Sequence, residues 1–109
     1  MDQLDARHSD MLSFDVVTDE AGSVTVTLRG ELDMSSAQEL DAAVSPTIQT
    51  LTGRLILDVD ELTFADSSAI ALWVRWATIT DQVEIHNASE LLRAVIQRMG
   101  LDQQLQLTP

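Results

Sequence analysis

The chain has 109 residues, 45% of them hydrophobic, which suits one domain with a single modest core. Eighteen acidic residues stand against six basic ones, all arginine, and give a formal net charge of −12. This charge would repel nucleic acid and anionic membranes, so we expect no nucleic-acid partner and no direct membrane contact. It favours partners with arginine or lysine at the contact surface. The alternative is that the charge serves solubility alone.

The first ten residues are acidic at their start and lack the basic start and apolar segment of a secretion signal. We expect residues 1–10 to form a flexible N-terminal tail and residues 11–109 to form the single domain. No apolar stretch approaches the roughly 20 residues needed to span a bilayer, so the cytoplasm is the expected compartment.

Two runs of alternating apolar residues, at 12–16 and 24–28, are separated by a short turn around Gly22. This pattern predicts a hairpin of two strands, the second ending at Gly30. Polar residues at 33–36 can cap a following helix, in which we expect a kink or a short second segment at Pro46 and an end by Gly53. Its apolar stripe comprises Ala37, Leu40, Val44, Ile48 and Leu51.

A continuous apolar run at 55–59 predicts a strand buried on both faces, as is typical of parallel sheets covered by helices. A second helix is expected from about Ser68 to Ala77, and a strand from Val83 to His86.

Ser89 is predicted to cap a third helix that ends at Gly100, and residues 105–107 to form a final edge strand. The expected apolar stripe of this helix comprises Leu91, Leu92, Val95 and Met99. The complete order, β-β-α-β-α-β-α-β, predicts an α/β domain with a mixed, mostly parallel sheet, an N-terminal β-hairpin and helices packed on the sheet.

Asp66-Ser67-Ser68-Ala69 lies where the buried strand ends and the second helix begins. The first turn of a helix presents unpaired N–H groups and the positive end of the macrodipole, so it stabilises an anion. A serine hydroxyl at this place has two uses, because it can cap the helix or carry a phosphoryl group.

Apolar residues cover roughly 220° of the second helix, more than the stripe of a little over 100° that a helix on a sheet commonly buries. Ile70 and Val74 lie toward the margin and are candidates for a contact surface beside the serines, unless a neighbouring helix covers them. The core side is expected to consist of Ala69, Leu72, Trp73 and Trp76.

Motifs for catalysis and metal binding are missing from the chain. There is no cysteine, no Gly-x-Ser-x-Gly elbow and no glycine-rich phosphate loop, and His8 and His86 are not placed as catalytic bases. An EF-hand loop starting at Asp58 would need glycine and glutamate where Thr63 and Ala69 stand. A receiver-type phosphoaspartate at Asp58 would need a lysine, and the chain has none. We therefore expect no catalysis, no cofactor and no metal.

Three segments together resemble STAS domains of the anti-anti-sigma type: residues 28–33, 55–68 and 83–101. The first resembles the strand-end Gly-Glu-Leu-Asp of that family. The second resembles its Asp-Ser-Ser/Thr-Gly signature at the start of the second helix, with Ala69 in place of the usual glycine. The third resembles its last strand–helix unit with the following Gly-Leu. The similarity extends over roughly residues 12–107 and implies the STAS fold.

The resemblance implies a phosphorylation switch. In anti-anti-sigma factors the first serine after the aspartate, here Ser67 and with less support Ser68, is phosphorylated by an anti-sigma factor that is also a histidine-kinase-like ATPase. The unmodified form binds this kinase, the phosphorylated form is released, and a PP2C-type phosphatase resets the switch. The partner-binding residues implied are Asp33, Asp66, Ser67, Ser68, Ala69, Ile70 and Val74.

An alternative is a STAS module that binds its partner without being phosphorylated, such as the small cytoplasmic subunit of a bacterial lipid-transport ABC complex. Ser67 would then be only a helix cap, and Ile70 and Val74 would contact an ATPase.

Overall fold

The computed structural model describes residues 11–109, so the predicted tail at residues 1–10, with His8, lies outside the described residues. The predicted order of elements is confirmed. The strands and helices are β1 (Leu12–Thr18), β2 (Val24–Leu32), α2 (Met34–Gln49), β3 (Leu55–Ala65), α3 (Ser67–Thr80), β4 (Val83–His86), α4 (Glu90–Arg98) and β5 (Leu105–Thr108).

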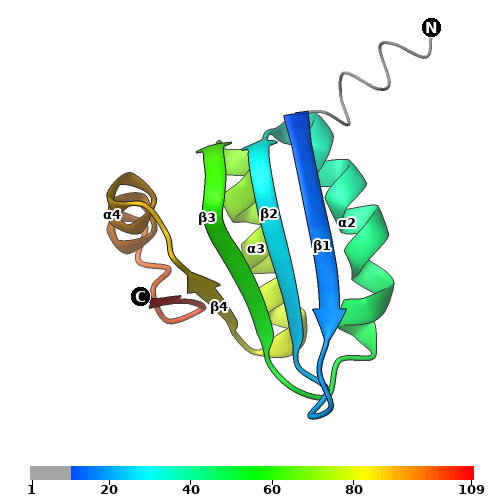
Figure 1. Cartoon of the computed structure of the whole chain (residues 1–109). Helices are drawn as coiled ribbons and strands as arrows, with labels where there is room; N and C mark the ends of the chain where they lie inside the picture. The colour runs from blue at the N-terminus through cyan, green and yellow to red at the C-terminus, as the bar shows by residue number, and fades with distance from the viewer. Residues whose placement is uncertain (1–10) are drawn as a thin grey trace, which may run out of the picture.

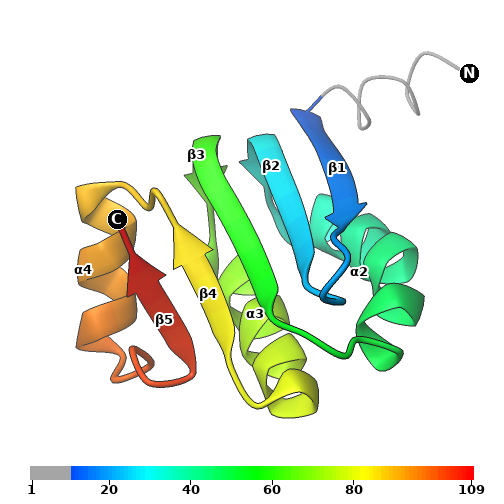
Figure 2. The same ribbon diagram turned by 60° about the horizontal axis from the view of Figure 1, so that its bottom comes forward.

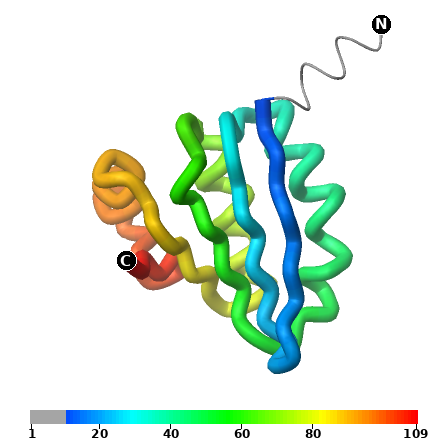
Figure 3. Tube along the Cα trace, viewed as in Figure 1, coloured from blue at the N-terminus to red at the C-terminus, as the bar shows by residue number. Residues whose placement is uncertain are grey.

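The five strands form one sheet in the order β1-β2-β3-β4-β5, and Figures 1 and 3 show the segments of β1, β2 and β3 running side by side. The β1–β2 hairpin is antiparallel, and every other neighbouring pair is parallel. Gly22 makes the hairpin turn with a φ of 85°, in the left-handed region that favours glycine. Because β2, β3 and β4 are parallel neighbours, their carboxyl ends lie at the same edge of the sheet.

Helices α2 and α3 lie behind the sheet in Figure 1, and Figure 2 shows the opposite face without a helix across it. Leu57 of β3 points to the helices and is buried, whereas Asp58, on the other face, is partly exposed. The prediction that this strand is buried on both faces is therefore wrong. Only Ile56 adds a buried side chain to the outer face of β3.

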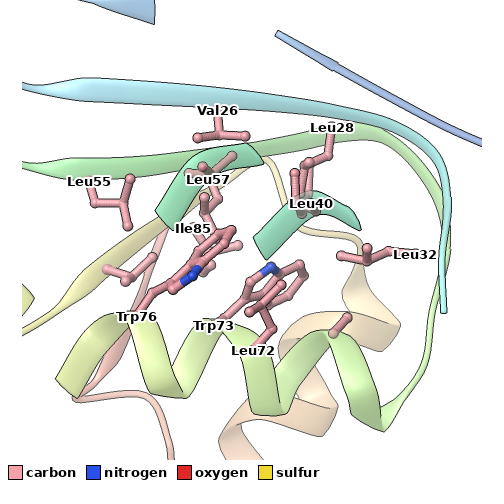
Figure 4. Close-up of a cluster of buried hydrophobic side chains, with 14 of the residues drawn as sticks. Val26, Leu28, Leu32, Leu40, Leu55, Leu57, Leu72, Trp73, Trp76 and Ile85 are labelled. Atoms are coloured by element: carbon pink, nitrogen blue, oxygen red, sulfur yellow. The ribbon is translucent and has the colours of Figure 1, made fainter. Parts of the chain in front are cut away.

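The core lies between this sheet and the two helices (Figure 4). The predicted core side of α3 is confirmed, because Ala69, Leu72, Trp73 and Trp76 are all buried. Both tryptophan rings pack among aliphatic side chains of the strands and of α2, including Leu28, Leu40, Leu57 and Ile85.

Two predictions about α2 and β2 are corrected. Helix α2 continues through Pro46 without a second segment and ends at Gln49. Pro46 removes a hydrogen bond to the carbonyl of Ala42, but both residues are exposed, so water can replace the missing donor. Strand β2 does not end at Gly30, since it runs on to Leu32.

The apolar stripe predicted for α4 has the wrong phase. Ile96 is the residue of α4 that is fully buried, whereas Leu91 and Met99 are exposed. Leu92 and Val95 pack partly against the core, and Ser89 caps the helix as predicted by accepting from the N–H of Leu92. A nine-residue helix at the edge of the sheet buries only a narrow stripe, so apolar residues on both sides of it stay in contact with solvent.

Candidate functional site

The amino-terminal ends of α2 and α3 lie side by side at the carboxyl edge of the sheet. Leu32, the last residue of β2, pairs in register with Ala65, the last residue of β3. The backbone N–H of Asp66 also donates to the carbonyl oxygen of Leu32, at 3.3 Å. Each strand passes into its helix through one aspartate, Asp33 for α2 and Asp66 for α3. The two positive helix ends therefore face solvent next to each other.

Asp33 starts α2 with a reciprocal capping box. Its Oδ1 accepts from the N–H of Ser36 at 3.0 Å, and the hydroxyl of Ser36 accepts from the N–H of Asp33 at 2.9 Å. Ser36 is buried, so its hydroxyl is committed to this structural role. The box satisfies two of the donors that a helix start leaves unpaired and fixes the direction in which α2 leaves the sheet.

Asp66 starts α3 as its N-cap, so the helix is capped by the aspartate and not by a serine. The Oδ1 of Asp66 accepts from the N–H of Ser68 at 2.9 Å, which makes Asp66 the N-cap and Ser67 the first helical residue. Ser67 is exposed, and its hydroxyl makes no hydrogen bond within residues 11–109. Asp66 therefore does the capping that the Ser67 hydroxyl could have done, and the Ser67 hydroxyl has no structural role in the described part of the chain.

Strand β3 changes its register against β2 twice before it reaches this site. Between Asp58 and Glu61, and again between Leu62 and Phe64, β3 contains one more residue than the facing stretch of β2. Such bulges bend a strand and redirect its side chains, and they are common beside functional sites. Strand β3 bends along its length in Figure 1, and Phe64, near its end, is exposed.

Two grooves flank the start of α3. One, of about 370 Å³, runs between α2 and α3 and includes Met34, Ser68 and Arg75 in its lining. The other, of about 250 Å³, lies between the end of β3, the first turns of α3 and the start of α4, with Ile70 in its lining. Ser68 therefore faces the first groove, and Ile70, one turn after Ser67, contributes to the second.

The remaining predicted contact residues differ in exposure. Ala69 is buried, so its side chain offers no surface to a partner in the free protein. Ile70 is only 5% exposed, through the groove just described, and Val74 is half-buried. The site therefore combines the exposed Ser67 with partly accessible neighbours.

Two exposed apolar residues of the site were missed by the sequence reasoning. Met34, the first residue of α2, is 65% exposed, and Phe64 is 50% exposed. Met34 follows directly after the capping aspartate, where a polar residue would serve the helix as well, and this is a signal that could have been read. Phe64 could not be placed, because its orientation depends on the bulges of β3.

The charged residues of the open sheet face are paired among themselves. Arg29 contacts Asp15 at 2.8 Å and Glu61 at 3.6 Å, and the hydrogen bond and charge of Asp15 raise the pKa of Arg29. His86 lies at the end of β4 as predicted, with its Nε2 3.0 Å from Glu84. Residues 11–109 hold no group of three or more potential metal ligands, and no helix among them is long and apolar enough to cross a membrane.

Comparison with known proteins yields one family and several similar structures. A family model described as "Mlab, STAS domain" matches residues 16–109. No curated protein matches this chain.

The structure of the anti-sigma factor antagonist SpoIIAA in its unphosphorylated form is 22% identical, covers 89% of this chain and 88% of its own, and has a TM-score of 0.73. That of the Bacillus cell fate determinant SpoIIAA in the phosphorylated form is 24% identical, covers 89% and 92%, and scores 0.72. An anti-sigma factor antagonist from Mycobacterium paratuberculosis is 23% identical, covers 92% and 87%, and scores 0.74. At these identities the likeness shows a shared fold.

Proposed function

This chain belongs to the STAS domain family, and on that premise we propose that it is an anti-sigma factor antagonist controlled by phosphorylation of Ser67. The unmodified protein binds an anti-sigma factor that is also a serine kinase of the histidine-kinase-like ATPase type. Phosphorylation of Ser67 releases this partner, and a PP2C-type phosphatase restores the binding form. The protein itself is a phosphoacceptor and a binding regulator without catalysis of its own.

The observation that carries the proposal is the division of labour between Asp66 and Ser67. Asp66 caps α3, so the exposed hydroxyl of Ser67 has no structural hydrogen bond to give up when it is modified. A phosphoryl group there sits at the positive end of α3, which stabilises an anion. Modification is therefore compatible with the folded domain.

The surroundings of Ser67 supply a reason why phosphorylation releases a partner. A phosphoserine adds a charge of about −1.5 to −2. Phe64 lies three residues before Ser67, and Met34 lines the same groove as Ser68. Both side chains are exposed and apolar, and they favour a contact that excludes water. A phosphoryl group within that contact must lose its hydration, and it also adds to the negative charge of Asp33 and Asp66. Local electrostatics and desolvation are sufficient, without a large conformational change.

Titration of the isolated partner with single variants tests the proposal. Ser67→Asp places a charge at the exposed first helical position and is expected to weaken binding strongly. Ser68→Asp places the same charge in the α2–α3 groove and is expected to weaken binding less. Equal binding by the wild type and Ser67→Asp would refute the switch.

A second candidate function is a STAS subunit that binds its partner without phosphorylation, such as the small subunit of a bacterial lipid-transport ABC complex. The description of the matching family model, which names Mlab, is the observation that favours it. In that case the same surface around Ser67, Ile70 and Val74 contacts an ATPase permanently, and no phosphate is found on Ser67 in the cell.

A further inference from the structure

The groove between β3 and α4 is the more apolar of the two grooves that flank the start of α3. It has a volume of about 250 Å³, and most of its lining is apolar, including Leu62, Phe64, Ile70, Leu91, Leu92 and Val95. Two of these side chains project far into solvent, since Phe64 is 50% and Leu91 is 76% exposed. Exposed apolar side chains that surround a groove are typical of a binding surface.

The size of the groove favours side chains of a protein as its occupant. Sites that enclose a small molecule usually measure roughly 300–1,000 Å³ and bury most of the ligand. This groove is smaller, and one of its walls is the exposed first turn of α4. A short, open apolar groove beside a helix is the geometry in which an amphipathic helix inserts residues spaced one turn apart.

Charge specifies the kind of helix. Two acidic residues adjoin the lining in the chain, Asp66 after Ala65 and Glu90 before Leu91, against one arginine, Arg93 after Leu92. Glu61, before Leu62, lies at the open sheet face beside Arg29. No lysine or arginine is among the described residues that line the groove. With a net charge of −12 on the whole chain, an occupant bearing arginine or lysine beside its apolar residues is attracted and an acidic one is repelled.

We propose that the β3–α4 groove docks a basic amphipathic helix of the partner. This inference rests on the proposed function for the identity of that partner, and it adds which part of the partner binds and where. Ile70, in the lining, lies one helical turn after Ser67 and on the same side of α3. The first turn of α3, which carries Ser67, therefore borders the docked helix, and a phosphoryl group there would have to lose its hydration.

The test uses two synthetic peptides and the isotope-labelled protein. One peptide is an amphipathic helix of leucine and arginine, and the other has glutamate at every arginine position. Nuclear magnetic resonance titration is expected to show saturable shifts for the arginine peptide at residues 62–65, 70 and 89–95. The acidic peptide is expected to cause none.

Leu91 in α4 and Met99, the residue after α4, form a matched pair, because both are exposed but only Leu91 lines the groove. Leu91→Gln is expected to weaken binding of the arginine peptide by about tenfold or more, as loss of an apolar anchor does. Met99→Gln is expected to leave the affinity within about twofold, in line with an ordinary surface substitution.

The docking proposal is overturned if both variants bind alike, if the acidic peptide binds as well, or if the shifts spread over the open sheet face. None of these readouts involves phosphorylation. If the peptide binds in the groove but Ser67→Asp leaves the partner bound, docking stands and the switch is refuted. If the peptide binds elsewhere but Ser67→Asp releases the partner, the docking proposal is refuted and the switch stands.

Discussion

The indole Nε1 of Trp76 donates a hydrogen bond to Oδ1 of Asp41 at 2.9 Å and thereby joins α3 to α2. The other carboxylate oxygen of Asp41 accepts from Arg75 at 2.8 Å. Trp76 is buried, while Asp41 and Arg75 lie in the groove between the two helices. The helices whose N-termini form the candidate site are thus held together by one shared carboxylate.

We expect Asp41→Ala to lower the free energy of unfolding by about 1–3 kcal/mol, because it leaves the buried N–H of Trp76 without an acceptor. Asp41→Asn keeps an acceptor oxygen and is expected to cost less. Arg75→Ala removes only an exposed ion pair, which is worth about 0–1 kcal/mol. Urea unfolding of the three variants gives the order, and an Arg75→Ala cost equal to that of Asp41→Ala would contradict it.

The two tryptophans of α3 differ in a way that a second pair of variants can measure. Both are buried, but the Nε1 of Trp73 has no hydrogen-bond partner within the described residues, whereas that of Trp76 has Asp41. Phenylalanine removes similar volume at either position. Trp76→Phe is therefore expected to cost about 0.5–1.5 kcal/mol more than Trp73→Phe, which is the usual net value of one hydrogen bond. Equal costs in thermal or urea unfolding would show that packing alone sets the contribution of each tryptophan to stability.

The cap of α3 is expected to depend on the aspartate and not on the serine after it. Asp66→Ala should lower the free energy of unfolding by about 0.5–2 kcal/mol, the usual cost of losing an N-cap side chain. Asp66→Asn retains a capping oxygen and serves as the control. Ser67→Ala should change the free energy of unfolding by no more than about 0.5 kcal/mol, since it alters an exposed position outside the cap. If Ser67→Ala is the more costly change, Ser67 has a structural role and the phosphoacceptor argument loses its basis.

Gly30 is expected to be intolerant of a side chain. Its φ is 98°, and a Cβ there would collide with the carbonyl oxygen of Met11, the residue before β1. We expect Gly30→Ala to lower the free energy of unfolding by about 1–3 kcal/mol, as for other strained backbone positions. Gly100→Ala is the comparison, because its φ of 71° is also positive but its Cβ would meet nothing. A cost for Gly30→Ala no larger than for Gly100→Ala would mean that β1 moves aside freely.

The sequence was sufficient for the order of elements and for the core of α3. Alternation in β2 and the close set of apolar residues at Trp73 and Trp76 are local patterns that report burial directly, whereas the alternation in β1 includes the exposed Val16. The Asp66–Ser67 boundary was located to within one residue. Whether Ser67 caps the helix was left open, because aspartate and serine are both good N-caps and the backbone decides between them.

Features that depend on long-range geometry could not be predicted. The exposure of Phe64 follows from two bulges of β3 against β2, which leave no periodic signal in the chain. The open face of the sheet follows from where the helices pack, so the run at residues 55–59 looked like a strand covered on both sides. Leu91 and Met99 were wrongly assigned to the buried stripe around α4, because these exposed residues match a helical period as well as the buried Ile96 does.

The most direct test of the central claim is affinity capture from a lysate of the host on wild-type protein, Ser67→Asp and Ser67→Asn, followed by mass spectrometry of what each retains. Asparagine matches the size of aspartate without its charge. If phosphorylation of Ser67 is the switch, a histidine-kinase-like ATPase is held by the wild type and by Ser67→Asn and is lost with Ser67→Asp. Retention of one ATPase equally by the wild type and Ser67→Asp would contradict the switch and assign the protein to a permanently bound complex.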